Sequence, residues 1–203
     1  MGPTFDLERQ LGGHVAGVDE VGRGPWAGPV TACAVILDPN NIPDGLNDSK
    51  KLSAARREAL AIEIEATAQI SVASATVDEI DRLNIRQATF LAMTRALAGL
   101  STIPTHALID GNALPADLPC PATGLIKGDT RSASIAAASI VAKVRRDAEM
   151  KALALVHPGY GWDTNKGYGT AAHAKALHDL GVTPHHRRSF APIHNMLCAE
   201  NRK

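Results

Sequence analysis

Three observations predict an α/β fold with a central mixed sheet flanked by helices. Short β-branched runs bounded by glycine or proline alternate with longer runs of helix-forming residues. Hydrophobic residues make up 45% of the 203 residues, enough for a core, whereas aromatic residues make up only 3%. No repeat, low-complexity tract or linker divides the chain. We therefore expect one domain over residues 1–203, with a core over about 14–150 and a C-terminal helical annex over about 151–203.

The first expected elements are two strands and a helix. "HVAGVD" (14–19) and "VTACAVIL" (30–37) are short, apolar and bounded by Gly and Pro, as strands commonly are. A segment dense in turn-forming residues follows and ends at Ser53. The Ser53 hydroxyl is a good N-cap, so the run of helix formers over 54–69 is predicted to be a helix.

The middle of the chain is predicted to add three strands and one helix. "ISVASATV" (70–77) alternates apolar and small polar residues as a strand does, and a helical stretch follows over about 78–99. "THALID" (105–110) and "ATGLIKGD" (122–129) are the last two expected strands, and each ends in an aspartate.

The clearest helical pattern covers residues 132–155, which are rich in alanine, apolar at helical spacing and basic on the far side. Small residues over 133–139 would let the first turns pack closely on a sheet. Residues 157–170 form a Gly-rich loop that is longer than packing requires, and loops of that length are often functional. A helix over about 170–180 and a tail are expected to close the chain.

Charge and cysteine content limit the class of protein. Residues 1–126 carry 9 Lys and Arg against 15 Asp and Glu, whereas residues 127–203 carry 12 against 6. Chance and solvated faces could explain this, as could an acidic site in the first part and a surface for a polyanion in the second. Cys33, Cys120 and Cys198 form no close pair, and we see no signal peptide or membrane-spanning run. We expect a cytoplasmic protein that does not bind membranes.

Carboxylates lie at the ends of three predicted strands: Asp19 with Glu20, then Asp110, then Asp129. Functional sites in open α/β sheets gather at strand ends. Carboxylates that lie together raise one another's pKa unless a cation holds them. A set of oxygen ligands without His or Cys suits Mg²⁺ or Mn²⁺. The sequence therefore predicts a divalent-metal centre.

Each acid taken singly could instead be a turn or capping residue. Asp129, for example, could cap a helix that begins near Arg131. Adjacent residues of a regular strand point to opposite faces of the sheet, so Asp19 and Glu20 cannot both face one metal on a regular strand. Either the strand breaks at Glu20, which Gly22 would permit, or one acid contributes mainly through its backbone.

Six segments resemble, in order, the signature stretches of the ribonuclease HII family, the type 2 ribonucleases H that cut RNA in RNA–DNA hybrids. They are "GVDEVGRGPWAGPV", "LNDSKKL", "LIDGN", "KGDTRSASIAAASIVAKVRRD", "GYGT" and "HHRRSFAP", and they lie within residues 14–192. The resemblance implies a ribonuclease H-like fold with a mixed five-stranded sheet and a C-terminal helical part. The first motif begins near residue 14, which favours type 2 over the related type 3 enzymes with their long N-terminal extension.

The resemblance also implies the site and its ligands. Four carboxylates bind two divalent ions in this family, and by motif match they are Asp19, Glu20, Asp110 and Asp129. The "GRG" segment, here Gly22, Arg23 and Gly24, contacts the ribose 2′-hydroxyl at the RNA–DNA junction, and Tyr168 stacks near that sugar. The expected partners are RNA–DNA hybrids and duplex DNA with embedded ribonucleotides. No obligate protein partner is evident, and we expect a monomer.

These residue types suit the implied chemistry. Two cations bridged by carboxylates can hydrolyse a phosphodiester without a Ser–His–Asp set, and the resemblance implies 5′-phosphate and 3′-hydroxyl products. Because glycine has no Cβ, the backbone at Gly22 and Gly24 could approach a ribose and bond its 2′-hydroxyl, although a plain Gly-Pro turn is the alternative. Tyr168 could be an ordinary packed aromatic, but its flanking glycines favour a stacking surface for a sugar or base.

Basic residues are candidates, as a group, for contact with nucleic-acid phosphates. They are Lys50, Lys51, Lys127, Lys143, Arg145, Arg146, Arg187 and Arg188. Among them we expect Lys50 to bind the substrate.

Three other functions use parts of the same pattern. A phosphatase could share the metal centre, but it would need neither a basic second half nor a group that recognises a 2′-hydroxyl. A nucleotide-binding module would fit the glycines, but "GRGPWAG" lacks the P-loop lysine and the dinucleotide glycine spacing. A non-catalytic nucleic-acid binder fits poorly, since clustered acids repel phosphates when no metal is bound.

Overall fold

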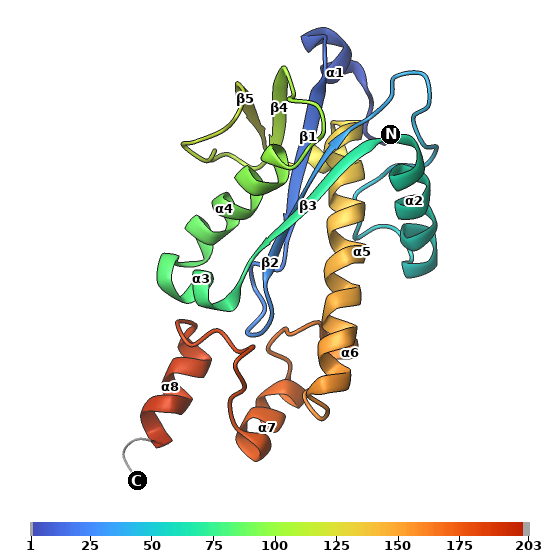
Figure 1. The fold of residues 1–203 in the computed structure, drawn as a ribbon. Helices are drawn as coiled ribbons and strands as arrows, with labels where there is room; N and C mark the ends of the chain where they lie inside the picture. Colours follow the sequence, from blue (N-terminus) through green and yellow to red (C-terminus); the bar gives the residue numbers. More distant parts are fainter. Residues whose placement is uncertain (1, 201–203) are drawn as a thin grey trace.

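The computed structural model describes residues 2–200, and a five-stranded sheet lies at its centre (Figure 1). The strands are β1 (Val15–Val21), β2 (Val30–Ile36), β3 (Gln69–Ala75), β4 (His106–Asp110) and β5 (Ala122–Leu125). Their order in the sheet is β3-β2-β1-β4-β5. The pairs β1–β2 and β2–β3 are antiparallel, whereas β1–β4 and β4–β5 are parallel. The predicted mixed five-stranded sheet is therefore confirmed.

Helices cover both faces of this sheet (Figure 1). One face packs against α3 (Val77–Leu83) and α4 (Ile85–Ala98), and the other against α2 (Ala54–Thr67) and α5 (Ala133–Val156). The small residues at the start of α5 allow close packing, as predicted. A Cβ added at Gly17 of β1 would lie 2.1 Å from the carbonyl carbon of Ser134.

The predicted helix over 78–99 is two helices in the structure. A capping box formed by Thr76 and Glu79 begins α3. The chain then turns at Asn84, which has a φ of 69°, and the Asn84 side chain caps α4 by accepting from the backbone N–H groups of Arg86 and Gln87. Asn84 therefore ends one helix and starts the next, which a continuous helical pattern does not reveal.

The C-terminal part of the chain lies beyond one end of the sheet (Figure 1). It contains α6 (Trp162–Asn165), which falls inside the predicted loop, then α7 (Ala171–Leu180) and α8 (Ala191–Glu200). Buried residues of these helices pack on Met150 near the end of α5 and on Ala27 between β1 and β2; they include Trp162, Leu177 and Ile193. Helix α8 and the short α1 (Asp6–Leu11) were not predicted. None of the helices described over residues 2–200 is long and apolar enough to cross a membrane.

Candidate active site

Asp19 and Glu20 lie near the end of β1 and point to opposite faces of the sheet. The strand continues regularly to Val21, with Glu20 opposite Ala32 in β2. Of the two alternatives, a break of the strand at Glu20 is therefore wrong. Asp19 is on the face of β1 that packs against α5, as Gly17 is, whereas Glu20 lines a groove of about 390 Å³ on the α4 face.

Asp110 lies beside both of these acids. Strands β1 and β4 are parallel and Val18 pairs with Ile109, so the next residues, Asp19 and Asp110, are neighbours at the same end of the sheet. Asp110 also lines the groove that contains Glu20. Its Oδ1 accepts a hydrogen bond of 2.7 Å from the backbone N–H of Gly128, which fixes the carboxylate at the strand end.

Asp129 does not lie in a strand, contrary to prediction. Strand β5 ends at Leu125, and Asp129 is in a 3₁₀ turn, η1 (Gly128–Thr130), before α5. The capping alternative is also wrong, because the N-cap of α5 is Ser132, whose side chain accepts from the N–H of Ile135. The turn places Asp129 near the site because its first residue is the one bonded to Asp110.

Asp19 is a buried carboxylate that forms no ion pair with any Lys or Arg of residues 2–200. Asp19 is only 7% exposed. Burial raises the pKa of Asp19 well above its usual value, and repulsion from Glu20 and Asp110 raises it further. The Ser139 hydroxyl and the N–H of Glu20, which donates to Asp19 Oδ1 at 2.7 Å, offset part of this shift.

Burial also raises the pKa of Glu20 and of Asp129, and Asp110 adds repulsion in each case. Each of the two has one basic neighbour that opposes the rise. Arg23 lies 3.4 Å from the Glu20 carboxylate, and Lys50 lowers the pKa of Asp129. Asp110 is thus the common neighbour of the other three acids.

The acids form a donor set that suits a hard divalent cation. Over residues 2–200, no three His, Cys, Asp or Glu side chains are close enough to hold a metal ion together. All four groups nevertheless offer only oxygen atoms, and Asp19 forms no ion pair with a Lys or Arg in the same part of the chain. A bound Mg²⁺ or Mn²⁺ would offset the repulsion that adds to the effect of burial on the pKa of Asp19, Glu20 and Asp129.

The two segments predicted to contact the sugar lie together in the structure. A Cβ added at Gly24 would be 3.4 Å from Cε1 of Tyr168, although 144 positions separate the residues in sequence. Gly22 has a φ of +91°, a conformation that glycine adopts readily. Arg23 and Gly24 are exposed, and Tyr168 is 46% exposed, so this face is open to a ligand.

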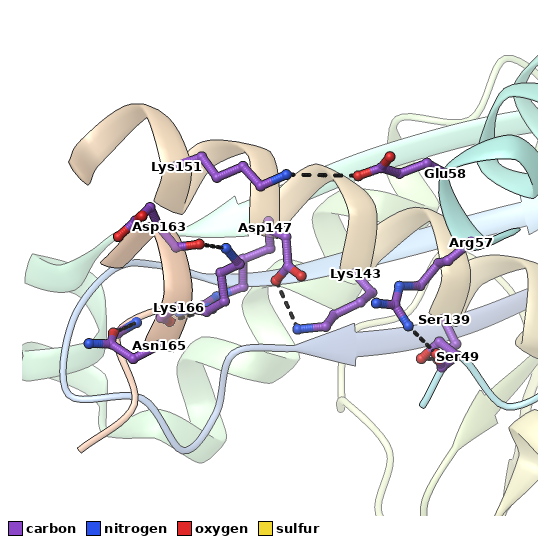
Figure 2. Close-up of polar contacts among 12 residues, drawn as sticks. Ser49, Arg57, Glu58, Ser139, Lys143, Asp147, Lys151, Asp163, Asn165 and Lys166 are labelled. Carbon is purple, nitrogen blue, oxygen red and sulfur yellow. Dashed lines mark hydrogen bonds and ion pairs between the residues drawn. The ribbon is translucent and has the colours of Figure 1, made fainter. Parts of the chain in front are cut away.

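Lys50 is exposed, and the residue before it, Ser49, is hydrogen-bonded to a residue that contacts Asp19. The hydroxyl groups of Ser49 and Ser139 lie 3.0 Å apart, and Ser139 is the residue that interacts with Asp19. Arg57 of α2 donates to the Ser49 carbonyl oxygen (Figure 2). Sequence reasoning missed Ser49, Ser139 and Arg57. The available signal was the position of Ser139 on the small-residue face of the α5 helix.

Two of the eight candidates for phosphate contact are buried, and two others form ion pairs. Arg146 and Arg187 are 0% exposed, and their guanidinium groups donate to backbone carbonyl oxygens. Lys143 pairs with Asp147 at 2.8 Å (Figure 2), and Arg145 pairs with Glu65 on α2. The candidates that are exposed and form no ion pair over residues 2–200 are Lys50, Lys51, Lys127 and Arg188.

The profile of the ribonuclease HII family matches residues 16–193, a range that contains all four acids, the "GRG" segment and Tyr168. This chain belongs to the ribonuclease HII family. It is 73% identical over 198 residues to ribonuclease HII of Jannaschia sp. (strain CCS1), covering 98% of this chain and 100% of that protein. It is 61% identical over 202 residues to ribonuclease HII of Ruegeria pomeroyi, covering 98% and 86%.

Solved structures show the same fold. The crystal structure of ribonuclease H2 from Pyrococcus horikoshii OT3 superposes with a TM-score of 0.78 at 25% identity, covering 94% of this chain and 100% of that one. The Bst-RNase HIII structure in complex with Mn²⁺ superposes with a TM-score of 0.74 at 24% identity, covering 96% and 73%. With the family match, the chain is a ribonuclease H, and its family depends on divalent metals and cleaves the RNA of RNA–DNA hybrids.

Proposed function

We propose that this ribonuclease HII nicks duplex DNA at single embedded ribonucleotides as well as cutting the RNA strand of hybrids, by a two-metal mechanism that gives 5′-phosphate and 3′-hydroxyl ends. This proposal rests on one observation: the segment proposed to bind the sugar lies directly beside the acids. Arg23 is 3.4 Å from Glu20, and the next residue, Gly24, faces Tyr168. A ribose held by this segment lies beside the carboxylates.

Asp19, Glu20, Asp110 and Asp129 are the proposed ligands of two ions, Mg²⁺ or Mn²⁺. Such ions supply activation of a water molecule and stabilisation of the leaving oxygen. The protein holds Asp110 through the Gly128 N–H and Asp19 through the Glu20 N–H, so these carboxylates are oriented before a ligand arrives. The crystal structure of the Bst-RNase HIII relative contains Mn²⁺, which is consistent with this choice of ion.

Gly22, Arg23, Gly24 and Tyr168 are the proposed recognition site for the ribose. A 2′-hydroxyl both donates and accepts hydrogen bonds, so backbone groups can distinguish ribose from deoxyribose. The exposed ring of Tyr168 offers a flat surface against which the sugar can pack. Lys50 is the proposed contact to a nearby phosphate, since it is exposed and close enough to Asp129 to lower the pKa of that carboxyl.

We further propose that residues 1–203 act as one domain and as a monomer in the cytoplasm. The packing of Ala27 with Met150 and Trp162 joins the core to the C-terminal helices in one cluster, which supports a single unit. The three cysteines are free thiols, as is usual in a reducing compartment.

The test is a cleavage assay on duplex DNA that contains one ribonucleotide, with Mg²⁺ or Mn²⁺, against an all-DNA duplex of the same sequence. Gel mobility gives the position of the nick, and phosphatase sensitivity of the products tests for the expected 5′-phosphate. Purified protein that nicks neither duplex, or nicks both equally, refutes the proposed function.

A further inference from the structure

Arg187 belongs to the segment after α7, but its side chain lies beneath the segment between β1 and β2. The Nε atom donates to the carbonyl oxygen of Gly28 at 2.9 Å, and Nη1 donates to that of Arg23 at 3.0 Å. Nη2 donates to the carbonyl oxygens of Gly22 at 2.5 Å and Pro29 at 3.1 Å. One fully buried guanidinium therefore holds four peptide units of a single loop.

Two of these peptide units belong to the proposed ribose site. The carbonyl of Gly22 shares a planar trans peptide with the N–H of Arg23, and the carbonyl of Arg23 shares one with the N–H of Gly24. The C=O and N–H groups of a trans peptide point in opposite directions. Because Arg187 binds both carbonyl oxygens, the two N–H groups point away from Arg187. Over residues 2–200, neither N–H donates to another backbone group. Arg187 thus presents two unused donors on the exposed side of the loop.

The residue before Arg187 fixes the other half of the ribose site. The N–H of Thr183 donates to His186 Nδ1 at 3.0 Å, so His186 carries its proton on Nε2. That nitrogen lies 3.1 Å from His173 Nε2, which must then accept, leaving the His173 proton on Nδ1. His173 Nδ1 donates to the carbonyl oxygen of Tyr168 at 3.0 Å. Adjacent residues therefore hold the "GRG" loop and the tyrosine.

The chemistry of Arg187 is more specific than packing requires. Neither Arg187 nor Arg146 forms an ion pair with a carboxylate in the described chain, and a buried charge without one is unfavourable. An apolar residue could fill the same volume. Only the rigid fork of a guanidinium can donate to several carbonyls in a fixed geometry, which a lysine cannot reproduce.

We propose that Arg187 is a positioning residue for ribose recognition. It orients the peptide units of Gly22 and Arg23 so that the N–H groups of Arg23 and Gly24 face the 2′-hydroxyl, and with His186 it sets their position relative to Tyr168. This inference rests on the proposed function.

The test compares Arg187→Lys with Leu177→Ala, a change in the same buried C-terminal cluster that contacts no part of the loop 22–29 by hydrogen bonding. Both are assayed below their melting temperatures on a duplex with one ribonucleotide, with all-DNA duplex as a competitive inhibitor. Arg187→Lys lowers kcat/KM about tenfold or more, mainly through kcat, because the sugar is bound but misplaced. The inhibition constant of the all-DNA duplex changes by no more than about twofold. Leu177→Ala keeps both values near those of the wild type.

The outcomes separate this inference from the proposed function. A wild type that does not nick at a ribonucleotide refutes the function. A wild type that nicks, with Arg187→Lys equally active or Leu177→Ala equally impaired, overturns the inference alone.

Amide hydrogen exchange of the wild type gives a test that needs no variant. Duplexes with and without the 2′-hydroxyl are compared under conditions in which both bind and neither is cleaved. Binding of the ribonucleotide duplex, but not of all-DNA duplex, slows exchange in residues 22–29 and in residues 183–189 together. Slower exchange in the first segment with no change in the second overturns the inference.

Discussion

The molecule contains two groups of buried charge of opposite sign, and they are balanced in different ways. Asp19 has no cationic partner over residues 2–200, and burial and neighbouring acids raise its pKa. Arg146 and Arg187 also lack carboxylate partners, but all three nitrogen atoms of each guanidinium donate to carbonyl oxygens. The buried arginines are therefore compensated by backbone carbonyls, whereas Asp19 has no ion-pair partner in the described chain.

The largest expected effect is on the acids. Asp19→Asn and Asp110→Asn each remove a proposed metal ligand, and losing several kcal/mol of transition-state stabilisation lowers the rate about 1,000-fold. The metal-free Asp19→Asn protein is at least as stable as the wild type, because the change removes a buried charge that nothing balances. Nicking assays and thermal denaturation measure the two quantities. A variant that nicks at near the wild-type rate is not missing a ligand.

Replacing a buried arginine should lower the stability of the protein, unlike Asp19→Asn. Arg146→Ala leaves the carbonyls of Ala27 and Lys166 without a donor, at about 1 kcal/mol or more each, whereas Pro29 keeps its bond from Arg187, so we expect a loss of about 2 kcal/mol or more in the free energy of unfolding. Arg145 is the matched control, since its pair with Glu65 is half exposed and Arg145→Ala changes stability by no more than about 0.5 kcal/mol. Urea unfolding measures both. Equal losses would mean that the carbonyl bonds contribute little.

The same contrast explains how far the sequence could be interpreted. Strand ends and helical periodicity depend on local pattern, so the helix predicted over 132–155 is found at Ala133–Val156 and Asp110 ends its strand. Carboxylates at strand ends are also visible locally. The partners of Arg187 are carbonyls about 160 positions away, and no local pattern reveals them. For Arg146 a signal existed, because it falls between Ala142 and Met150 at the four-residue spacing of a buried helix face.

Short or irregular elements could not be predicted from the sequence for a different reason. Helix α1 has six residues, too few to produce a periodic pattern, and the 3₁₀ turn that carries Asp129 has three. The break at Asn84 depends on a positive φ that asparagine permits but does not require. In these places the tertiary contacts, such as the bond from Gly128 to Asp110, determine the local conformation.

Metal binding should stabilise the folded protein through the carboxylates at the end of the sheet. A ligand that binds only the folded protein at ten times its Kd stabilises it by about 1.4 kcal/mol. We therefore expect Mg²⁺ or Mn²⁺ to raise the Tm of protein treated with a chelator. Asp110→Asn should show little or no shift, whereas Arg145→Ala should shift as the wild type does. An equal shift in Asp110→Asn would place the stabilising ion elsewhere.

The effect that is smallest at neutral pH concerns the histidines that hold Tyr168. Burial, with the neighbouring His173 ring, lowers the pKa of His186 to about 3. The unfolded chain therefore binds a proton on this residue near pH 6.5 that the folded protein does not bind until about pH 3. The neutral pair contributes its full stability above pH about 6.5 and loses it as the pH falls, by at most about 1.4 kcal/mol per pH unit.

Other groups titrate in the same range, so the informative quantity is the difference between variants. His186→Gln keeps a donor and an acceptor at this position but cannot take up the proton, and its stability should decline less steeply between pH 6 and 4 than that of the wild type, by about 1 kcal/mol per pH unit. His178→Gln, at an exposed position of α7, should follow the wild-type curve. Urea unfolding at several pH values measures these slopes. Parallel curves for all three proteins would show that His186 takes up its proton at the same pH in the folded and unfolded chain, so that the buried pair adds no acid sensitivity.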